Sequence, residues 1–176
     1  MLNKSDIQEA QENVKSYLSQ GLLKKSHEDR LVEAIFIKNG KESLRVAELV
    51  YRENISDLWA IVCSYYSMYY YANAVLMKFG YKVGDKIVHK VTSDALIVFV
   101  RGKLKKSILE NYEEVKEEAL TIAGIRADNL IESFELERKK RGLIQYRTMD
   151  LEKHSKAKTS IDRASEFNRE MQKLLV

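Results

Sequence analysis

The chain has 176 residues, a length at which one domain can bury a sizeable hydrophobic core without disulfides or bound metal. Thirty Lys and Arg against 26 Asp and Glu give a net charge of +4, which is too small to identify a nucleic-acid binder by itself. A single cysteine, Cys63, excludes an intrachain disulfide, and its apolar neighbours predict a buried small side chain rather than a nucleophile.

The composition favours long helices. The sequence contains no proline and only 7 glycines, the two residues that most often interrupt helices, while 45% of its residues are apolar and 32% are charged. It also lacks a glycine-rich phosphate loop, a Cys/His metal spacing and a nucleophile elbow. We therefore expect no metal site and no cofactor.

The N-terminal segment has no apolar core of the signal-peptide type, so the sequence predicts a cytoplasmic protein. Residues 58–77 contain no charge for twenty residues, which matches the length of a membrane span. However, this run holds five tyrosines, whose hydroxyls would lack partners in the middle of a bilayer. We expect a buried central helix here and no membrane association.

In chain order, apolar residues at three- and four-residue spacing predict a first helix that stops at Gly21. Ser26 with Asp29 resembles the start of a second helix, and Asn39-Gly40 resembles its left-handed end. A third helix is expected over residues 41–52.

The pair Ser56-Asp57 predicts the start of the central helix, which should end at Gly80. Residues 82–85 read as a loop. Residues 88–100 contain enough β-branched residues to form a strand, but their setting among helices favours a short buried helix.

Residues 103–141 predict one long helix, or two that meet near Gly124, closed by the basic cluster at 138–141. Basic residues in a last helical turn also complement the helix dipole. Phosphate binding and a plain helix C-terminus are therefore equally good interpretations of this cluster. The last helix is expected over 156–174, with one apolar face formed by Ala157, Ile161, Ala164, Phe167 and Met171.

No repeat or flexible linker divides the chain. We therefore predict a single domain over 1–176, in which helices at 4–40 precede a core at about 41–176. The fold class is all-α, an up-and-down helical bundle of about five to seven helices.

Four segments, taken in order, resemble the HEPN domain family of nucleotide- and RNA-associated helical proteins. They are the tyrosine-rich run at 64–72, the Phe-Gly-Tyr-Lys turn at 79–82, the pair His89-Lys90, and residues 137–146 leading to Ala-Ser-Glu-Phe at 164–167. One departure is Gln145, where the family often has Asp before the closing Tyr. This puts in doubt the polar contacts of that corner.

The resemblance implies a small helical protein that is a partner of a nucleotidyltransferase in a toxin-antitoxin or defence setting, and an action on RNA is a further implication. HEPN ribonucleases carry an Arg followed by a His, and Arg147 and His154 fit that spacing at its upper limit. The alternative function is therefore a dimeric, metal-independent endoribonuclease, in which Arg147 and His154 are catalytic and the protomers form a homodimer.

In that alternative, a His near neutral pH exchanges protons with the ribose 2′-hydroxyl or the leaving oxygen, while an Arg stabilises phosphate charge. The expected substrate-binding residues are Lys140, Arg141, Tyr146 and His89. His89 also has a purely structural interpretation, as a residue that caps or packs at a loop-helix junction. A third possibility is a non-catalytic domain that binds a nucleotide through the basic cluster and tyrosine rings.

Overall fold

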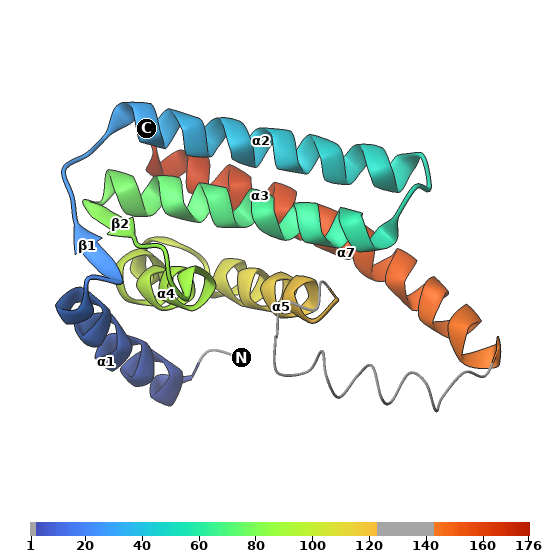
Figure 1. The fold of residues 1–176 in the computed structure, drawn as a ribbon, viewed down its shortest axis with the longest axis horizontal. Coiled ribbons are helices and arrows are strands. Elements are labelled where there is room, and N and C mark those ends of the chain that lie inside the picture. Colours follow the sequence, from blue (N-terminus) through green and yellow to red (C-terminus); the bar gives the residue numbers. More distant parts are fainter. Residues whose placement is uncertain (1–2, 123–142) are drawn as a thin grey trace.

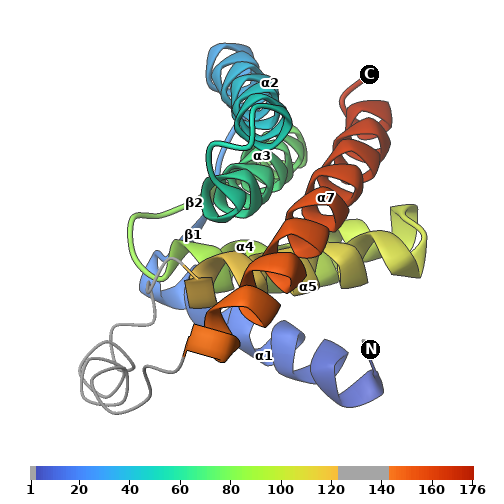
Figure 2. The same cartoon turned by 90° about the vertical axis from the view of Figure 1, so that its right-hand side faces the viewer.

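The computed structural model describes residues 3–122 and 143–176. Within these ranges the protein is an all-α bundle of six α-helices, with one two-stranded sheet whose strands have three residues each. The predicted fold class and helix number are therefore confirmed. Figure 1 shows the long helices stacked side by side, and Figure 2 shows the same bundle viewed down its long axis.

Helix α1 (Lys4–Gln20) begins with a capping box, because the side chains of Asn3 and Asp6 each accept from the other residue's backbone N–H. It ends as predicted at Gly21, whose φ of 71° is in the left-handed region. The chain then forms strand β1 (Leu23–Lys25), which pairs antiparallel with strand β2 (Tyr81–Val83).

Helix α2 (Arg30–Arg52) is one continuous helix, so the predicted end at Asn39-Gly40 was wrong. The residue that caps α2 is Asp29, and not Ser26. The Asp29 carboxylate accepts from the backbone N–H groups of Leu31 and Val32. The asparagine–glycine signal is overridden by tertiary packing, because Gly40 lies directly against the next long helix.

Helix α3 (Asp57–Lys78) is the central helix that the sequence predicts. Ser56 caps it by accepting from Trp59 N–H at 3.2 Å, and Gly80 follows its end with a φ of 82°. It packs against α2, α5 and α7, and buried residues occur on all its sides. Among the helices described, none combines the length and the apolarity that crossing a membrane requires.

Strand β2 (Tyr81–Val83) includes residues 82 and 83, which the sequence places in a loop at 82–85. These residues form a strand because they find a partner strand much earlier in the chain. The segment after it is helical as predicted, although it also has β-branched residues. Helix α4 (Val88–Ala95) continues into a π-helical turn η1 (Leu96–Val100) and a 3-10 turn η2 (Arg101–Lys103).

Helix α5 (Lys106–Ile122) packs against α3 and against the last helix, α7 (Leu143–Leu174). Helix α7 begins before the predicted position 156. The expected apolar face of this helix is confirmed, since Ala157, Ile161, Ala164, Phe167 and Met171 are all buried. The predicted junction at Gly124 and the basic cluster at 138–141 lie outside the described residues.

Close approach of α2 and α3 at Gly40 gives a stability prediction. A Cβ at this position would lie 2.7 Å from Cδ2 of Tyr71, a buried ring, and Ser67 Oγ donates to the Gly40 carbonyl at 2.6 Å. We expect Gly40→Ala to lower the free energy of unfolding by about 1–3 kcal/mol, as overpacking does, despite the better helix propensity of alanine. Chemical denaturation measures this.

The control is Gly102→Ala, because a Cβ at that glycine would meet nothing within 4 Å. It should leave the free energy of unfolding unchanged or slightly raised. Equal effects of the two substitutions would contradict close packing at Gly40.

Candidate functional site

His154 lies where three helices meet. Its Nδ1 is 2.9 Å from Oδ1 of Asp57, the first residue of α3. Its ring stacks on Tyr51 of α2, with 4.6 Å between ring centroids and 20° between ring planes. The histidine side chain is 45% exposed and the Asp57 side chain 26% exposed, so the imidazole is both held in place and open to solvent.

The short connection between α2 and α3 creates this arrangement. Helix α2 ends at Arg52, the turn passes through Asn54 in the left-handed region with a φ of 52°, and α3 starts at Asp57. The last turn of α2 and the first turn of α3 therefore lie next to each other. Packing of α7 on α3 then brings His154 against both.

Arg147 belongs to α7 and precedes His154 by seven residues, close to two helical turns. The two Cα atoms therefore lie near the same side of the helix, about 10.5 Å apart along its axis. Tyr146 is also in this helix, and the side chains of residues 146 and 147 are outside what the structure describes. Lys140 and Arg141 lie wholly outside the described residues.

His89, in the first turn of α4, does not join His154. Its Nδ1 is 2.6 Å from the Tyr65 hydroxyl, and its ring lies 5.4 Å from that of Tyr65 and 5.2 Å from that of Tyr69. Tyr65 is eight residues further along α3 than Asp57, or about 12 Å along the helix axis. The two histidines therefore contact different parts of the central helix.

Burial, and secondly the positive charge of Lys116, lower the pKa of His89 below its ordinary value of 6.5. Burial also raises the pKa of Tyr65. Both groups are therefore neutral near pH 7, and the Tyr65 hydroxyl can donate a hydrogen bond to an unprotonated Nδ1 of His89. This pair joins α4 to α3 through a hydrogen bond in a half-buried aromatic cluster.

Two buried charged residues were missed by the sequence analysis. Lys116 of α5 is only 8% exposed; its ammonium donates to Ser93 Oγ at 2.7 Å and contacts the Glu113 carboxylate. Asp94 of α4, also 8% exposed, accepts from the Tyr17 hydroxyl at 2.8 Å. Burial, and secondly the hydrogen bond to Asp94, raise the pKa of Tyr17.

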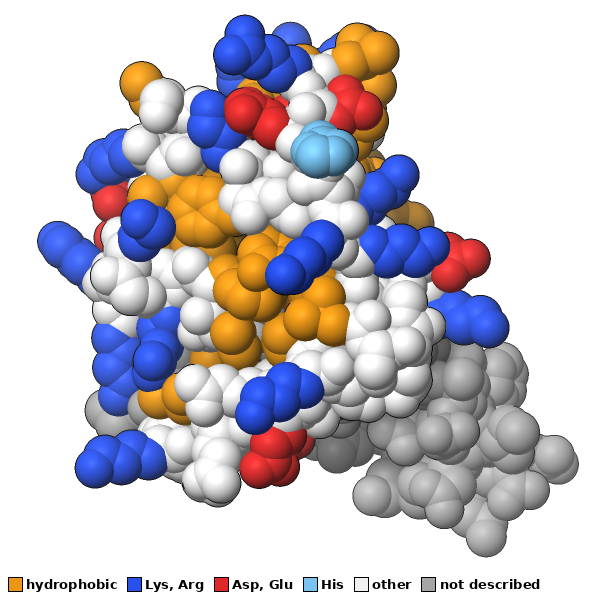
Figure 3. Space-filling view, turned by 90° about the vertical axis from the view of Figure 1, so that its left-hand side faces the viewer, with side chains coloured by type: hydrophobic (Ala, Val, Ile, Leu, Met, Phe, Trp, Pro, Cys, Tyr) orange, Lys and Arg blue, Asp and Glu red, His pale blue; other side chains and the backbone are white. Residues whose placement is uncertain are grey.

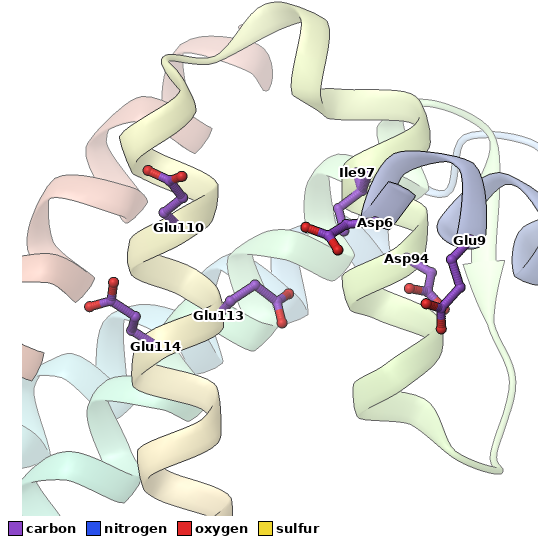
Figure 4. A pocket seen from close by; sticks show the side chains of 7 residues that line it. All are labelled: Asp6, Glu9, Asp94, Ile97, Glu110, Glu113 and Glu114. Carbon is purple, nitrogen blue, oxygen red and sulfur yellow. The ribbon is translucent and has the colours of Figure 1, made fainter. Parts of the chain in front are cut away.

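Asp94 also lies on the wall of an acidic cavity of about 280 Å³ between α1, α4 and α5. Figure 4 shows its carboxylates, which come from all three helices. The lining residues are Asp6, Glu9, Asp94, Ile97, Glu110, Glu113 and Glu114. Within the described ranges, no group of three or more His, Cys, Asp or Glu side chains is arranged to hold a metal ion. Five of the cavity's six carboxylates pair with a cation, namely Lys90 for Glu9 and Asp94, Lys106 for Glu110, Lys116 for Glu113 and Arg163 for Glu114.

Cys63 is a free thiol of intermediate burial on α3. Burial raises the pKa of this thiol, so the reactive thiolate is disfavoured. The residue packs against the hydrophobic core but is only partly buried, whereas the sequence predicts a buried side chain.

Comparison with protein-family models, with curated proteins and with solved structures finds no match to this chain.

The buried position of His89 predicts a pH dependence. The folded chain holds this imidazole neutral at a pH where the unfolded chain protonates it, because the folded pKa is the lower one. The contribution of His89 to the free energy of unfolding should therefore be complete above pH 6.5 and decrease as the pH falls from there to the folded pKa.

Comparing the parent with His89→Gln by denaturation across pH measures this contribution, and an NMR titration of the imidazole gives the midpoint directly. The difference in unfolding free energy between the two proteins should shrink on acidification. A midpoint at or above 6.5 would contradict a neutral, half-buried His89.

Proposed function

We propose that this HEPN-like bundle cleaves RNA without a metal ion, using His154 as the proton-transferring group and Arg147 to stabilise phosphate charge. The observation that carries the proposal is the placement of His154, which is oriented by the Asp57 carboxylate and the Tyr51 ring yet remains 45% exposed. A histidine fixed by a carboxylate and still open to solvent has the arrangement of a general acid-base residue.

The hydrogen bond to Asp57 determines which nitrogen is free. When Nδ1 carries its proton and donates to Asp57 Oδ1, the lone pair of neutral His154 is on Nε2. Nε2 then accepts the proton of a ribose 2′-hydroxyl while the 2′-oxygen attacks phosphorus. The bond between phosphorus and the 5′-oxygen breaks, the proton that Nε2 took up passes to this departing oxygen, and a 2′,3′-cyclic phosphate is left. Asp57 is a positioning residue in this scheme, because it does not touch the substrate.

Arg147 enters the proposal through its place on α7. Its Cα lies about 10.5 Å along the helix axis from that of His154, on nearly the same side. In the proposed homodimer, a second protomer brings another Arg147 and His154 to a shared site. Lys140, Arg141 and Tyr146 are the proposed RNA-positioning residues, because they precede this helical segment closely in the chain.

The first test is cleavage of labelled RNA by the purified protein in excess chelator. We expect the parent to cleave, and His154→Ala to lower kcat by about 100- to 10,000-fold, the range for loss of a general acid-base group. Arg147→Ala should also lower kcat. Asp57→Asn should lower kcat with little change in KM, because it disturbs the orientation of the imidazole and not the binding of RNA.

The matched control is His27→Ala, which removes an exposed histidine that precedes α2. This variant should cleave like the parent, and melting curves should show that all four variants fold. Cleavage that survives His154→Ala in full would contradict the proposal.

A second candidate function is binding of a partner protein, such as the nucleotidyltransferase that the resemblance implies. Large hydrophobic side chains are exposed along α2, in the turn after it and at the start of α3: Leu31, Ile35, Val46, Leu49, Ile55 and Trp59. Exposed apolar side chains on neighbouring elements favour a protein interface. Val46 and Leu49 also line a groove of about 500 Å³ with Arg45 and Arg52.

Co-expression with a nucleotidyltransferase and purification of the complex tests this candidate. Leu49→Asp, at a side chain 46% exposed, should weaken the complex while the isolated bundle stays folded. Lys15→Asp on α1 is the surface control. An unchanged yield of complex with Leu49→Asp would place any partner elsewhere.

A further inference from the structure

Positive charge is concentrated at the end of the molecule where α3 terminates. Three segments meet there through the β1–β2 pairing and the contact of Tyr81 with Phe99: residues 22–28, 78–86 and 99–106. They contain nine Lys and Arg against two acidic residues, a net charge of +7 in a chain whose total is +4. The remainder of the chain therefore has a net charge of −3, so the positive charge of this end exceeds that of the whole chain.

Most of these cations are not neutralised within the protein. Lys78 pairs with Glu28 at 3.1 Å. In contrast, Lys24, Lys25 and Lys82 form no ion pair with any residue that the structure describes, and all three are exposed. Lys24 lies directly opposite Lys82 in the two-stranded sheet, on the same face. Like charges at directly opposed positions repel each other, so this pair opposes folding and favours an anionic ligand.

Aromatic rings lie among these cations. The Tyr81 ring stacks on Phe99, with 3.9 Å between centroids and 14° between planes, and both residues are only partly buried. Lys103 Nζ lies 5.6 Å above the centroid of the Phe79 ring. Figure 3 looks onto this end of the molecule, where hydrophobic side chains gather near the centre and Lys and Arg side chains surround them.

We propose that this surface binds single-stranded RNA. Unpaired cations attract the phosphate backbone, and partly exposed aromatic rings offer stacking faces to unpaired bases. Lys24 and Lys82 project from one face of the two-stranded sheet, and Tyr81 projects from the opposite face, where it stacks on Phe99. A flexible strand that crosses this end of the molecule can place phosphates against the lysines and bases against the rings. We call Lys24, Lys25, Tyr81, Lys82, Phe99 and Lys103 the RNA-binding surface.

This inference rests on the proposed ribonuclease function, and it identifies where the substrate RNA is held. It lies at the far end of α3 from Asp57 and His154, about 33 Å away for a helix of 22 residues. RNA bound there is therefore anchored away from the cleavage site.

The test is fluorescence anisotropy with a labelled single-stranded RNA in chelator, measured over a range of salt concentrations in the His154→Ala background so that no cleavage occurs. The variant Lys24→Gln with Lys82→Gln should lower affinity at least tenfold. The slope of log affinity against log salt should decrease by about 1.4, or about 0.7 for each phosphate that a lysine no longer neutralises. The melting temperature should not fall, because a repulsive pair has been removed.

The matched control is Lys38→Gln with Lys41→Gln, two exposed lysines of α2, which changes the charge by the same amount. It should reduce affinity much less. An equal loss of affinity in both double variants would overturn the inference. So would absence of RNA binding together with binding to vesicles that contain anionic phospholipid.

Failure of this inference and failure of the proposed function give different results. If the parent cleaves RNA through His154 but the Lys24/Lys82 variant binds RNA normally, the surface is wrong and the ribonuclease function stands. If that variant loses RNA binding but the His154→Ala protein cleaves RNA at the same rate as the parent, the surface stands and the catalytic assignment is wrong.

Discussion

The architecture depends on burying most of α3 among its neighbours. Its tyrosines and serines need hydrogen-bond partners once they are buried, and several of these partners lie on neighbouring helices. The Tyr65 hydroxyl contacts His89 of α4, the Tyr71 hydroxyl accepts from Gln172 of α7, and Ser67 Oγ accepts from Asn168 of α7. These contacts give a central helix of unusual composition a single packing arrangement. They also determine where α7, and therefore His154, meets the start of α3.

Local signals in the sequence predicted most of the fold. The cap at Ser56, the stop at Gly21 and the apolar face of α7 act within a few residues, and all three were confirmed. The errors arose where contacts distant in sequence decide the structure. Asn39-Gly40 resembles a helix end, but packing of Gly40 against Tyr71 holds α2 continuous. The β1–β2 pair was missed because neither three-residue strand has a pattern of its own.

The candidate site could be predicted only in part, because it too depends on contacts between residues distant in sequence. The spacing of Arg147 and His154 selected the histidine, but its orienting carboxylate is 97 residues away, and no sequence pattern connects them. The concentration of positive charge around β1 and β2 was equally hidden, because it combines three segments that become neighbours only in the fold.

The most direct test of the central claim replaces one atom of the substrate. After the main cleavage position in an RNA oligonucleotide is mapped, the same oligonucleotide is made with a 2′-deoxy nucleotide on the 5′ side of the cleaved bond. If His154 activates the ribose 2′-hydroxyl, cleavage at that position stops, and the all-RNA product ends in a 2′,3′-cyclic phosphate. Cleavage of the deoxy-substituted oligonucleotide at the same position and rate would contradict this account, because it would show that the 2′-hydroxyl is not the attacking group.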